Sequence, residues 1–261
     1  MATAGMAVST RGALAQSAKL DAIARNIANL LTVGYRRETV GFRANLEAAT
    51  AFDPRPGDLD VTRRPLDLAI DGPGYFTVRD LETGADLYTR AGNFNIDSSG
   101  RLVTADGRCQ ALASDGRPLA LDAATAGSVR VAEDGTLISG DVEYGQLGVV
   151  EFEDVARLAR RGDNLVENRG ALALDTAGLR AAEPAPDGAA DGSAPPRQGR
   201  VGGASGSRIR QGTLERSSVD PALEQAELTR ALRALEANLQ MIRIMDAALE
   251  RTVNEFARPL K

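Results

Sequence analysis

The stretch that decides the fold is LDLAIDGPGYFTVR, residues 66–79. Apolar and polar side chains alternate over residues 66–70, as they do in a strand with one buried face. Residues 71–74, Asp-Gly-Pro-Gly, are the types that favour a tight turn. A second alternating run follows at residues 75–79. The stretch therefore predicts two short strands joined by a turn.

Further short strands are predicted on the C-terminal side of this stretch, separated by turn residues such as the Asp-Ser-Ser-Gly of 97–100. The candidates are residues 87–90, 93–96, 101–104, 129–131, 136–138 and 146–152. Cys109 lies where a turn leads into another probable strand, so we interpret it as a small, partly buried side chain. Many short strands without a helical pattern between them predict an all-β sandwich or barrel-like module at residues 66–180.

A long helix is predicted at the C-terminal end. Asp220 can cap it, Pro221 suits the first helical position, and neither Gly nor Pro recurs before Phe256. Its seam positions are spaced by four and three residues, as in a coiled coil: Leu228, Leu232, Leu235, Leu239, Ile242, Asp246, Leu249, Val253 and Phe256. A helix of about 36 residues would reach ~54 Å, longer than a compact domain of this size, which disfavours a helix lying on its own domain.

Asp246 interrupts the predicted seam. A carboxylate at a core position is costly unless it is paired. We expect it to make a register-setting polar contact across helices. The alternative is a locally widened seam in which Met245 turns inward.

A helix is also predicted near the N-terminus, where Leu20, Ile23, Ile27 and Leu30 are spaced by three, four and three residues. Gly34 can form its left-handed cap. The fold we predict is a mainly β central module with long N- and C-terminal helices that pair as a coiled coil, α+β overall. The expected divisions are an N-terminal assembly helix at 1–37, an extended connector at 38–65, the β module at 66–180, a flexible low-complexity segment at 181–207, and the C-terminal connector and helix at 208–261.

Composition excludes several functional classes. The chain of 261 residues has a net charge of −5, so it does not resemble a nucleic-acid binder. It has no His and one Cys, which removes the commonest general base and the usual metal-ligand sets. We expect no catalytic residues, no metal and no cofactor. No apolar run is long enough to insert in a membrane, and the first residues do not resemble a cleaved signal peptide.

Three separated stretches together resemble the flagellar basal-body rod and hook protein family. The first is residues 20–29, LDAIARNIAN, followed by Thr32, Gly34 and Tyr35. The second is residues 65–76 and 88–94, followed by Asp97, Gly100 and residues 102–104. The third is residues 211–220, then 235–238 and Asp246, with Ser218 where the family usually has Asn.

This resemblance implies an axial subunit of the bacterial flagellum. Its expected partners are other rod subunits, both copies of itself and homologous axial proteins, together with the flagellar export apparatus and the surrounding basal-body rings. Its expected location is the periplasm-spanning rod of the basal body, reached by export without a cleaved signal peptide. The stretch between Tyr35 and Leu66 is short for the family, which favours a proximal-rod subunit, with a distal-rod subunit second.

The predicted function is a structural subunit that polymerises through its terminal helices into a torque-transmitting shaft, because contacts that do not close into a ring give an open assembly. The predicted assembly residues are Leu20, Ile23, Asn26, Ile27, Asn29, Leu30, Leu228, Leu232, Leu235, Asn238, Leu239, Ile242, Asp246, Leu249, Val253 and Phe256. The alternative is a soluble β-domain binding module whose end helices form a closed oligomer. An enzyme would need a catalytic group that the sequence does not offer.

Overall fold

The computed structural model describes residues 2–42, 48–122, 128–152, 155, 158–162, 164–168, 173–174 and 206–256. The chain divides into two compact units. The helical unit comprises Met1–Leu30, Arg37–Asp53 and Val219–Lys261, and the β unit comprises Leu31–Arg36 and Pro54–Ser218.

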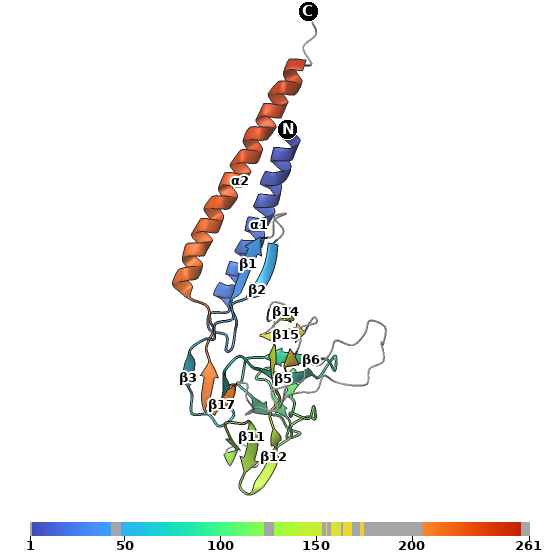
Figure 1. Cartoon of the computed structure of the whole chain (residues 1–261), viewed down its shortest axis with the longest axis vertical. Coiled ribbons are helices and arrows are strands. Elements are labelled where there is room, and N and C mark those ends of the chain that lie inside the picture. Colours follow the sequence, from blue (N-terminus) through green and yellow to red (C-terminus); the bar gives the residue numbers. More distant parts are fainter. Residues whose placement is uncertain are drawn as a thin grey trace, which may run out of the picture. The chain divides into compact units, whose positions relative to one another are not determined.

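The helical unit is built from two helices and a hairpin. Helix α1 (Ala2–Ala28) and helix α2 (Pro221–Phe256) lie side by side and run antiparallel (Figure 1). The hairpin of β1 (Glu38–Phe42) and β2 (Ala48–Phe52) packs against α1. The predicted cap of α2 is confirmed, because Asp220 Oδ1 accepts hydrogen bonds from the amides of Ala222 at 2.9 Å and Leu223 at 3.3 Å.

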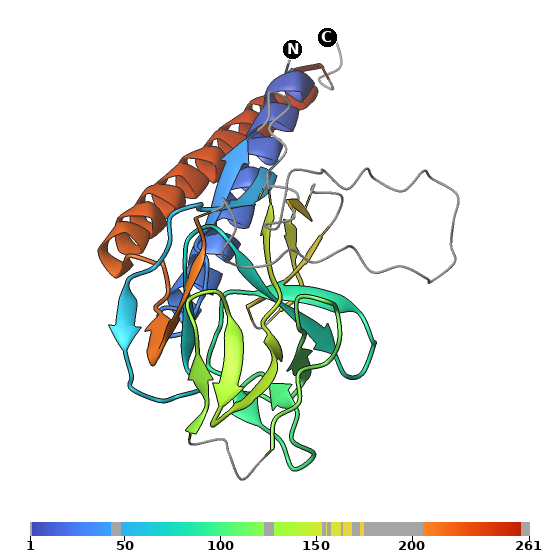
Figure 2. The same ribbon diagram turned by 60° about the horizontal axis from the view of Figure 1, so that its bottom comes forward.

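The β unit contains short strands paired antiparallel, seen from a second side in Figure 2. Its strands are β3 (Leu59–Val61), β4 (Leu68–Asp71), β5 (Tyr75–Asp80), β6 (Asp86–Thr89), β7 (Asn95–Ile96), β8 (Leu102–Val103), β9 (Cys109–Ala111), β10 (Arg130–Val131), β11 (Thr136–Ser139), β12 (Val142–Gln146), β13 (Val149–Phe152), β14 (Leu158–Arg160), β15 (Leu165–Asn168), β16 (Ala173–Leu174), β17 (Arg208–Gln211) and β18 (Thr213–Glu215).

The largest sheet follows the order β14-β15-β6-β5-β9-β8-β7, with β13 pairing to both β5 and β16. Three smaller sheets have the orders β10-β11-β12, β17-β4 and β18-β3. The last two bring the segment after the low-complexity region back to strands near the start of the β unit. The strands predicted from residues 66–79 are confirmed as β4 and β5.

The hydrophobic core lies in the β unit. Phe76 and Phe94 meet edge to face with ring centroids 5.3 Å apart, surrounded by Leu, Val and Ile side chains. Gly92 is required beside them, because a Cβ there would clash with the carbonyl oxygen of Leu68. A core built mainly from aliphatic residues is what a chain with 4% aromatics can form.

The predicted coiled coil is wrong. The described chain is mainly β, with two helices, and α+β remains a compatible description. Leu232 and Leu239, which a coiled coil would bury as knobs, are 45% and 43% exposed. Small or flexible residues stand instead at alternate positions of the contact between the helices: Gly12 of α1 lies against the side-chain amide of Asn238. The sequence pattern misled because α2 has more apolar residues than its contact with α1 covers.

The predicted flexible segment 181–207 lies outside the described residues except for its last two positions. The division of the chain into the five functional segments stays a prediction. Among the described residues, no helix is long and apolar enough to cross a membrane.

Candidate assembly interface and two buried polar clusters

The contact face of α2 is a line of buried and half-buried residues. Its members are Glu224, Leu228, Ala231, Leu235, Asn238, Ile242, Met245 and Leu249. The spacing of four and three residues equals that of the predicted seam, but alternate members are displaced by one position. Ala231, Asn238 and Met245 replace Leu232, Leu239 and Asp246. Small and flexible side chains thereby stand at these alternate positions.

The predicted assembly residues of α2 are therefore divided. Leu228, Leu235, Asn238, Ile242 and Leu249 lie on the line that faces α1. Leu232, Leu239 and Asp246 are exposed. In the chain by itself, Met245 is half-buried beside an exposed Asp246, as in the alternative arrangement of the seam. Val253 and Phe256 belong to α2, but their side chains lie outside the described set.

The predicted residues of α1 are also divided. Ile23 and Asn26 are buried, and Leu20 is half-buried. Ile27 is exposed. Asn29 and Leu30, which follow the helix, are half-buried. The side-chain amide of Asn29 donates to the carbonyl oxygen of Arg25 at 2.9 Å.

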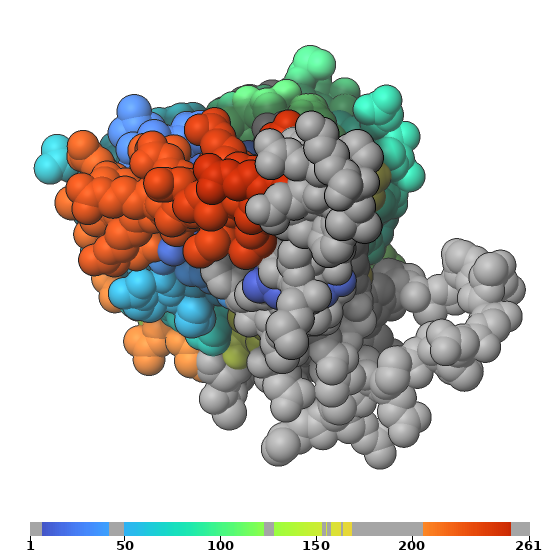
Figure 3. Space-filling view, turned by 90° about the horizontal axis from the view of Figure 1, so that it is seen from above, coloured from blue at the N-terminus to red at the C-terminus, as the bar shows by residue number. Residues whose placement is uncertain are grey.

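Helix α2 also exposes large apolar side chains away from its contact line. We call Leu232, Leu239, Met241 and Ile244 the outer apolar residues. The space-filling view shows the orange and red atoms of α2 at the surface over much of the helix (Figure 3). At 100° per residue, Leu232 and Leu239 share one flank of the contact line, and Met241 and Ile244 lie on the opposite flank. Exposed apolar residues on a helix are typical of a surface that another chain covers. The predicted residues Leu232 and Leu239 thus remain available for contacts outside the chain.

A buried polar cluster, the Glu224 cluster, joins the three parts of the helical unit. Asn26 of α1 donates to the Glu38 carbonyl at 2.9 Å, accepts from the Glu38 amide at 2.9 Å, and donates to Glu224 Oε1 at 3.2 Å. Arg37 also pairs with Glu224 Oε1. Arg25 pairs with Glu38 at 2.9 Å. Helix α1, the hairpin and α2 are thus bound through fully buried Asn26 and Glu224.

Sequence reasoning placed Asn26 in the family-like motif and missed its partners. Glu224 lies in the first turn of α2, and nothing in the sequence around it indicates Asn26, 198 positions earlier. Glu224 Oε2 has no hydrogen-bond partner among the described residues. A buried carboxylate with directional partners fixes geometry more than it adds stability.

A second buried cluster, the Glu215 cluster, lies in the β unit. Glu215 of β18 is 1% exposed, and Arg90 is 2% exposed. Arg90 Nε and Nη2 lie 2.8 and 2.7 Å from Glu215 Oε2, and Arg36 Nη2 lies 3.4 Å from Oε1. Both arginines lie in or beside the stretches that carry the family resemblance, and so does Glu215. The ion pairs of Arg36 and Arg90 with Glu215 therefore connect the three stretches that carry the family resemblance.

The remaining donors of Arg90 are also satisfied. They reach the carbonyl oxygens of Gly72 at 2.8 Å, Ile70 at 3.3 Å and Gly74. Burial lowers the pKa of the Arg90 guanidinium, while the adjacent Glu215 raises it. Burial likewise raises the pKa of the neighbouring Tyr75, against the lowering effect of Arg36 and Arg90.

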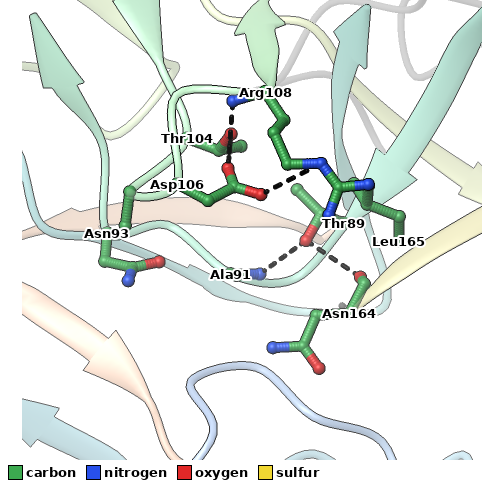
Figure 4. Close-up of a pocket in the computed structure, with 9 residues that line it drawn as sticks. Thr89, Ala91, Asn93, Thr104, Asp106, Arg108, Asn164 and Leu165 are labelled. Carbon is green, nitrogen blue, oxygen red and sulfur yellow. Dashed lines mark hydrogen bonds and ion pairs between the residues drawn. The ribbon is translucent and has the colours of Figure 1, made fainter. Parts of the chain in front are cut away.

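The β unit also has a cavity of about 360 Å³, shown in Figure 4. Asp106 and Arg108 line one side, with a charge separation of 3.9 Å. The Thr89 hydroxyl donates to the Asn164 carbonyl at 3.1 Å and accepts from the Ala91 amide at 3.0 Å. Within the described residues, no group of three or more His, Cys, Asp or Glu side chains could hold a metal ion. Within the lining the Thr104 hydroxyl donates to Asp106 Oδ1, so the cavity offers the polar atoms of a binding surface.

Three parts of the chain match known families. Residues 6–36 match the family described as flagella basal body rod protein. Residues 69–139 match the flagellar hook protein FlgE/F/G D1 domain, and residues 210–255 match the flagellar basal body rod FlgEFG protein C-terminal region. The flagellar basal-body rod protein FlgG of Bacillus subtilis is 32% identical over 90% of this chain and 92% of its own length. The chain belongs to the flagellar basal-body rod protein family.

Other members of this rod family resemble the chain to a similar degree. FlgF of Caulobacter vibrioides is 29% identical over 86% of each chain, and FlgF of Salmonella typhimurium is 29% identical over 90% of this chain and 91% of its own length. The interpretation as a structural rod protein of the bacterial flagellum is confirmed. The FlgG and FlgF relatives have similar sequence identities to this chain. The choice between a proximal-rod and a distal-rod subunit therefore stays a prediction.

Proposed function

We propose that this rod protein polymerises through its terminal helices and transmits torque along the axial shaft. The observation that carries this proposal is the set of outer apolar residues of α2. Leu232, Leu239, Met241 and Ile244 are 43–58% exposed on the two flanks of the contact line, and the contact line itself faces α1. Burying such side chains against another chain is favourable by roughly 1.5–3 kcal/mol each when complete.

The polar clusters support a load-bearing role. Directional buried bonds resist displacement of the elements that they join, and packed interiors are stiff. A subunit that repeats head to tail without closing forms an open shaft. We infer that the partners are further copies of this chain and homologous axial proteins, with the basal-body rings around them.

We infer that the chain is delivered by the flagellar export apparatus without a cleaved signal peptide and becomes part of the periplasm-spanning rod. We also infer that it is not an enzyme. The relatives are named as rod proteins, and the chain has neither a histidine nor an exposed described cysteine to serve as a reactive group.

The test is replacement of Leu239 by Asp, because a carboxylate beside Leu232 on this flank of α2 would have to be desolvated at every subunit contact. We expect the purified variant to keep its near-ultraviolet circular dichroism and to lose concentration-dependent sedimentation into open-ended assemblies. The matched control is Glu236→Asp, an exposed position one turn earlier on α2 that already has a carboxylate.

A stable dimer or tetramer of fixed size at all concentrations would favour the binding-module alternative. Assembly of Leu239→Asp as efficient as that of the parent chain would exclude the outer apolar residues as the contact surface.

A further inference from the structure

The chain passes between the helical unit and the β unit at four points, after residues 30, 36, 53 and 218. On the β-unit side these points belong to three segments. They are residues 31–36, residues 54–58 and residues 213–218. Any force or displacement that travels along the chain between the units must enter the β unit through one of these passage segments.

A single residue bonds to all of the passage segments. The backbone carbonyl of Glu215 accepts the Gly34 amide at 2.8 Å. Its Oε1 accepts the Gly57 amide at 3.1 Å and pairs with Arg36. Glu215 itself lies in the third segment, so each of the three segments is fixed to this one residue.

The passage segments are also bonded to one another around Glu215. Arg36 Nη1 donates to the Pro54 carbonyl at 2.8 Å. The Arg216 amide donates to the Asp58 carbonyl at 2.8 Å, and the Ser218 amide donates to the Tyr35 carbonyl at 3.0 Å. These bonds form a connected network that has the buried carboxylate near its centre.

Two glycines allow the segments to approach this closely. A Cβ at Gly57 would clash with the carbonyl oxygen of Arg216. Gly34 has a φ of +66° and lies directly against the backbone of Arg90. The close approach is therefore a specific feature of the backbone, which larger residues at either position would prevent.

Arg90 fixes this network to the β unit. Its guanidinium holds Glu215 Oε2 on one side and the carbonyl oxygens of Ile70, Gly72 and Gly74 on the other. Those carbonyls belong to β4 and to the turn that leads into β5. The connection thus runs from the passage segments, through one carboxylate and one guanidinium, into the strands that border the hydrophobic core.

We propose that Glu215 is the positioning residue that binds the three passage segments together and fixes them to the β unit, so that load entering by any passage reaches the β unit through its carboxylate. The proposal rests on the proposed rod function only for the source of the load. The coupling of the segments is a property of the purified chain.

The test is amide hydrogen exchange of the full-length Glu215→Gln variant, in which an amide of similar size replaces the carboxylate and turns a donor group toward Arg90. We expect the amides of Gly34, Gly57, Arg216 and Ser218 to exchange faster together, by about tenfold or more. The amides of Leu102 and Leu112, bonded within the β unit, should change less than about twofold. Acceleration confined to Gly57, the direct side-chain partner, would overturn the proposal.

The matched control is Glu151→Gln. Glu151 is also a buried carboxylate of the β unit, but it accepts a hydrogen bond from the Ser207 hydroxyl, which lies outside the passage segments. We expect the four passage amides to keep their exchange rates in this variant. Equal acceleration in both variants would mean general loosening of the β unit and would overturn the proposal.

If Glu215→Gln does not fold, Arg36→Gln decides the question, because it leaves the Glu215–Arg90 pair intact. Its expected result is faster exchange at Gly34, Gly57 and Ser218 with Leu112 unchanged, and unchanged exchange at all three would overturn the proposal. The outcome is separate from that of the rod function, since coordinated exchange can occur in a chain that never assembles, and an assembling chain can lack it.

Discussion

The two units differ in the kind of residue that is buried inside each of them. In the β unit the buried residues are largely Leu, Val, Ile and Phe, gathered in one cluster. In the described part of the helical unit the buried residues are mostly small or polar, with Ile23 and Val219 as the aliphatic exceptions. They are Ser9, Ala15, Ala22, Ile23, Asn26, Glu38, Asp53, Val219, Glu224 and Ala231. The β unit gains its stability mainly from apolar burial, whereas the helical unit keeps large apolar residues at its surface. Their difference suits a subunit whose helical part is completed by neighbours.

The polar clusters differ in the same way. Glu215 is bound by two arginines and an amide, so its site has a positive excess. Glu224 shares Oε1 between Arg37 and Asn26, and its Oε2 has no hydrogen-bond partner among the described residues. Both carboxylate oxygens of Glu215 thus have partners, whereas one carboxylate oxygen of Glu224 has none among the described residues. The following four experiments test the comparison, from the largest expected effect to the smallest.

Replacing Phe94 by Ala should destabilise the β unit by about 3–5 kcal/mol, because it removes a fully buried ring that packs on Phe76. Urea unfolding followed by tyrosine fluorescence measures this, since all four tyrosines lie in the β unit. The control is Leu81→Ala at an exposed position, which should change stability by less than about 0.5 kcal/mol. A loss below about 1 kcal/mol for Phe94→Ala would contradict the apolar account of this unit.

Replacing Glu224 by Gln should loosen the helical unit by about 3 kcal/mol, because Arg37 would lose its buried charge partner. Amide exchange along α2 is the measurement. Glu227→Gln is the control: Glu227 pairs with Lys19 at a partly exposed site, where the loss should be about 0–1 kcal/mol. Equal changes in amide exchange for the two substitutions would mean that the burial of Glu224 does not strengthen its ion pair with Arg37.

High pH should weaken the β unit selectively through Tyr88. Burial raises the pKa of Tyr88 to about 12. The folded state therefore binds the phenol proton more tightly than the unfolded state, so stability is complete below about pH 10 and falls by roughly 2–3 kcal/mol as the pH rises to about 12. Urea midpoints across this window measure the fall, and Tyr88→Phe should make it shallower. An identical pH slope in the Phe variant would contradict the assignment.

Replacing Asp246 by Ala should change stability by less than about 0.5 kcal/mol, because the side chain is exposed in the single chain. Thermal unfolding of dilute protein is the measurement. A change above about 1 kcal/mol would restore Asp246 as a core position of α2. An effect seen only at assembling concentrations would instead place it at a contact between subunits.

The sequence predicted those features that depend on neighbouring residues. The alternation of residues 66–70 and 75–79 located β4 and β5, and the Asp220-Pro221 pair located the start of α2. These signals succeed because turns, caps and one-face burial are set within a few positions.

The sequence could not predict which line of α2 residues contacts α1. Leu232 and Ala231 lie on adjacent lines of α2, and the helical period does not decide which of them meets α1 when several lines are apolar. The answer depends on how closely the helices approach, and one close approach is that of Gly12 to the Asn238 side chain. The pairing of Arg90 with Glu215, 125 positions apart, was equally out of reach because no local pattern identifies a distant partner.

Asn26 has a consequence for the chemical ageing of the protein. Its side-chain amide pairs with both backbone groups of Glu38, donating through the nitrogen and accepting through the oxygen, as a neighbouring strand would. Loss of ammonia would convert it to aspartate, which has nearly the same shape but no donor, and which would set a new negative charge against Glu224. Its complete burial and the β-branched residue that follows it slow that reaction. The contact that deamidation would disrupt thus lies at the least accessible asparagine among the described residues.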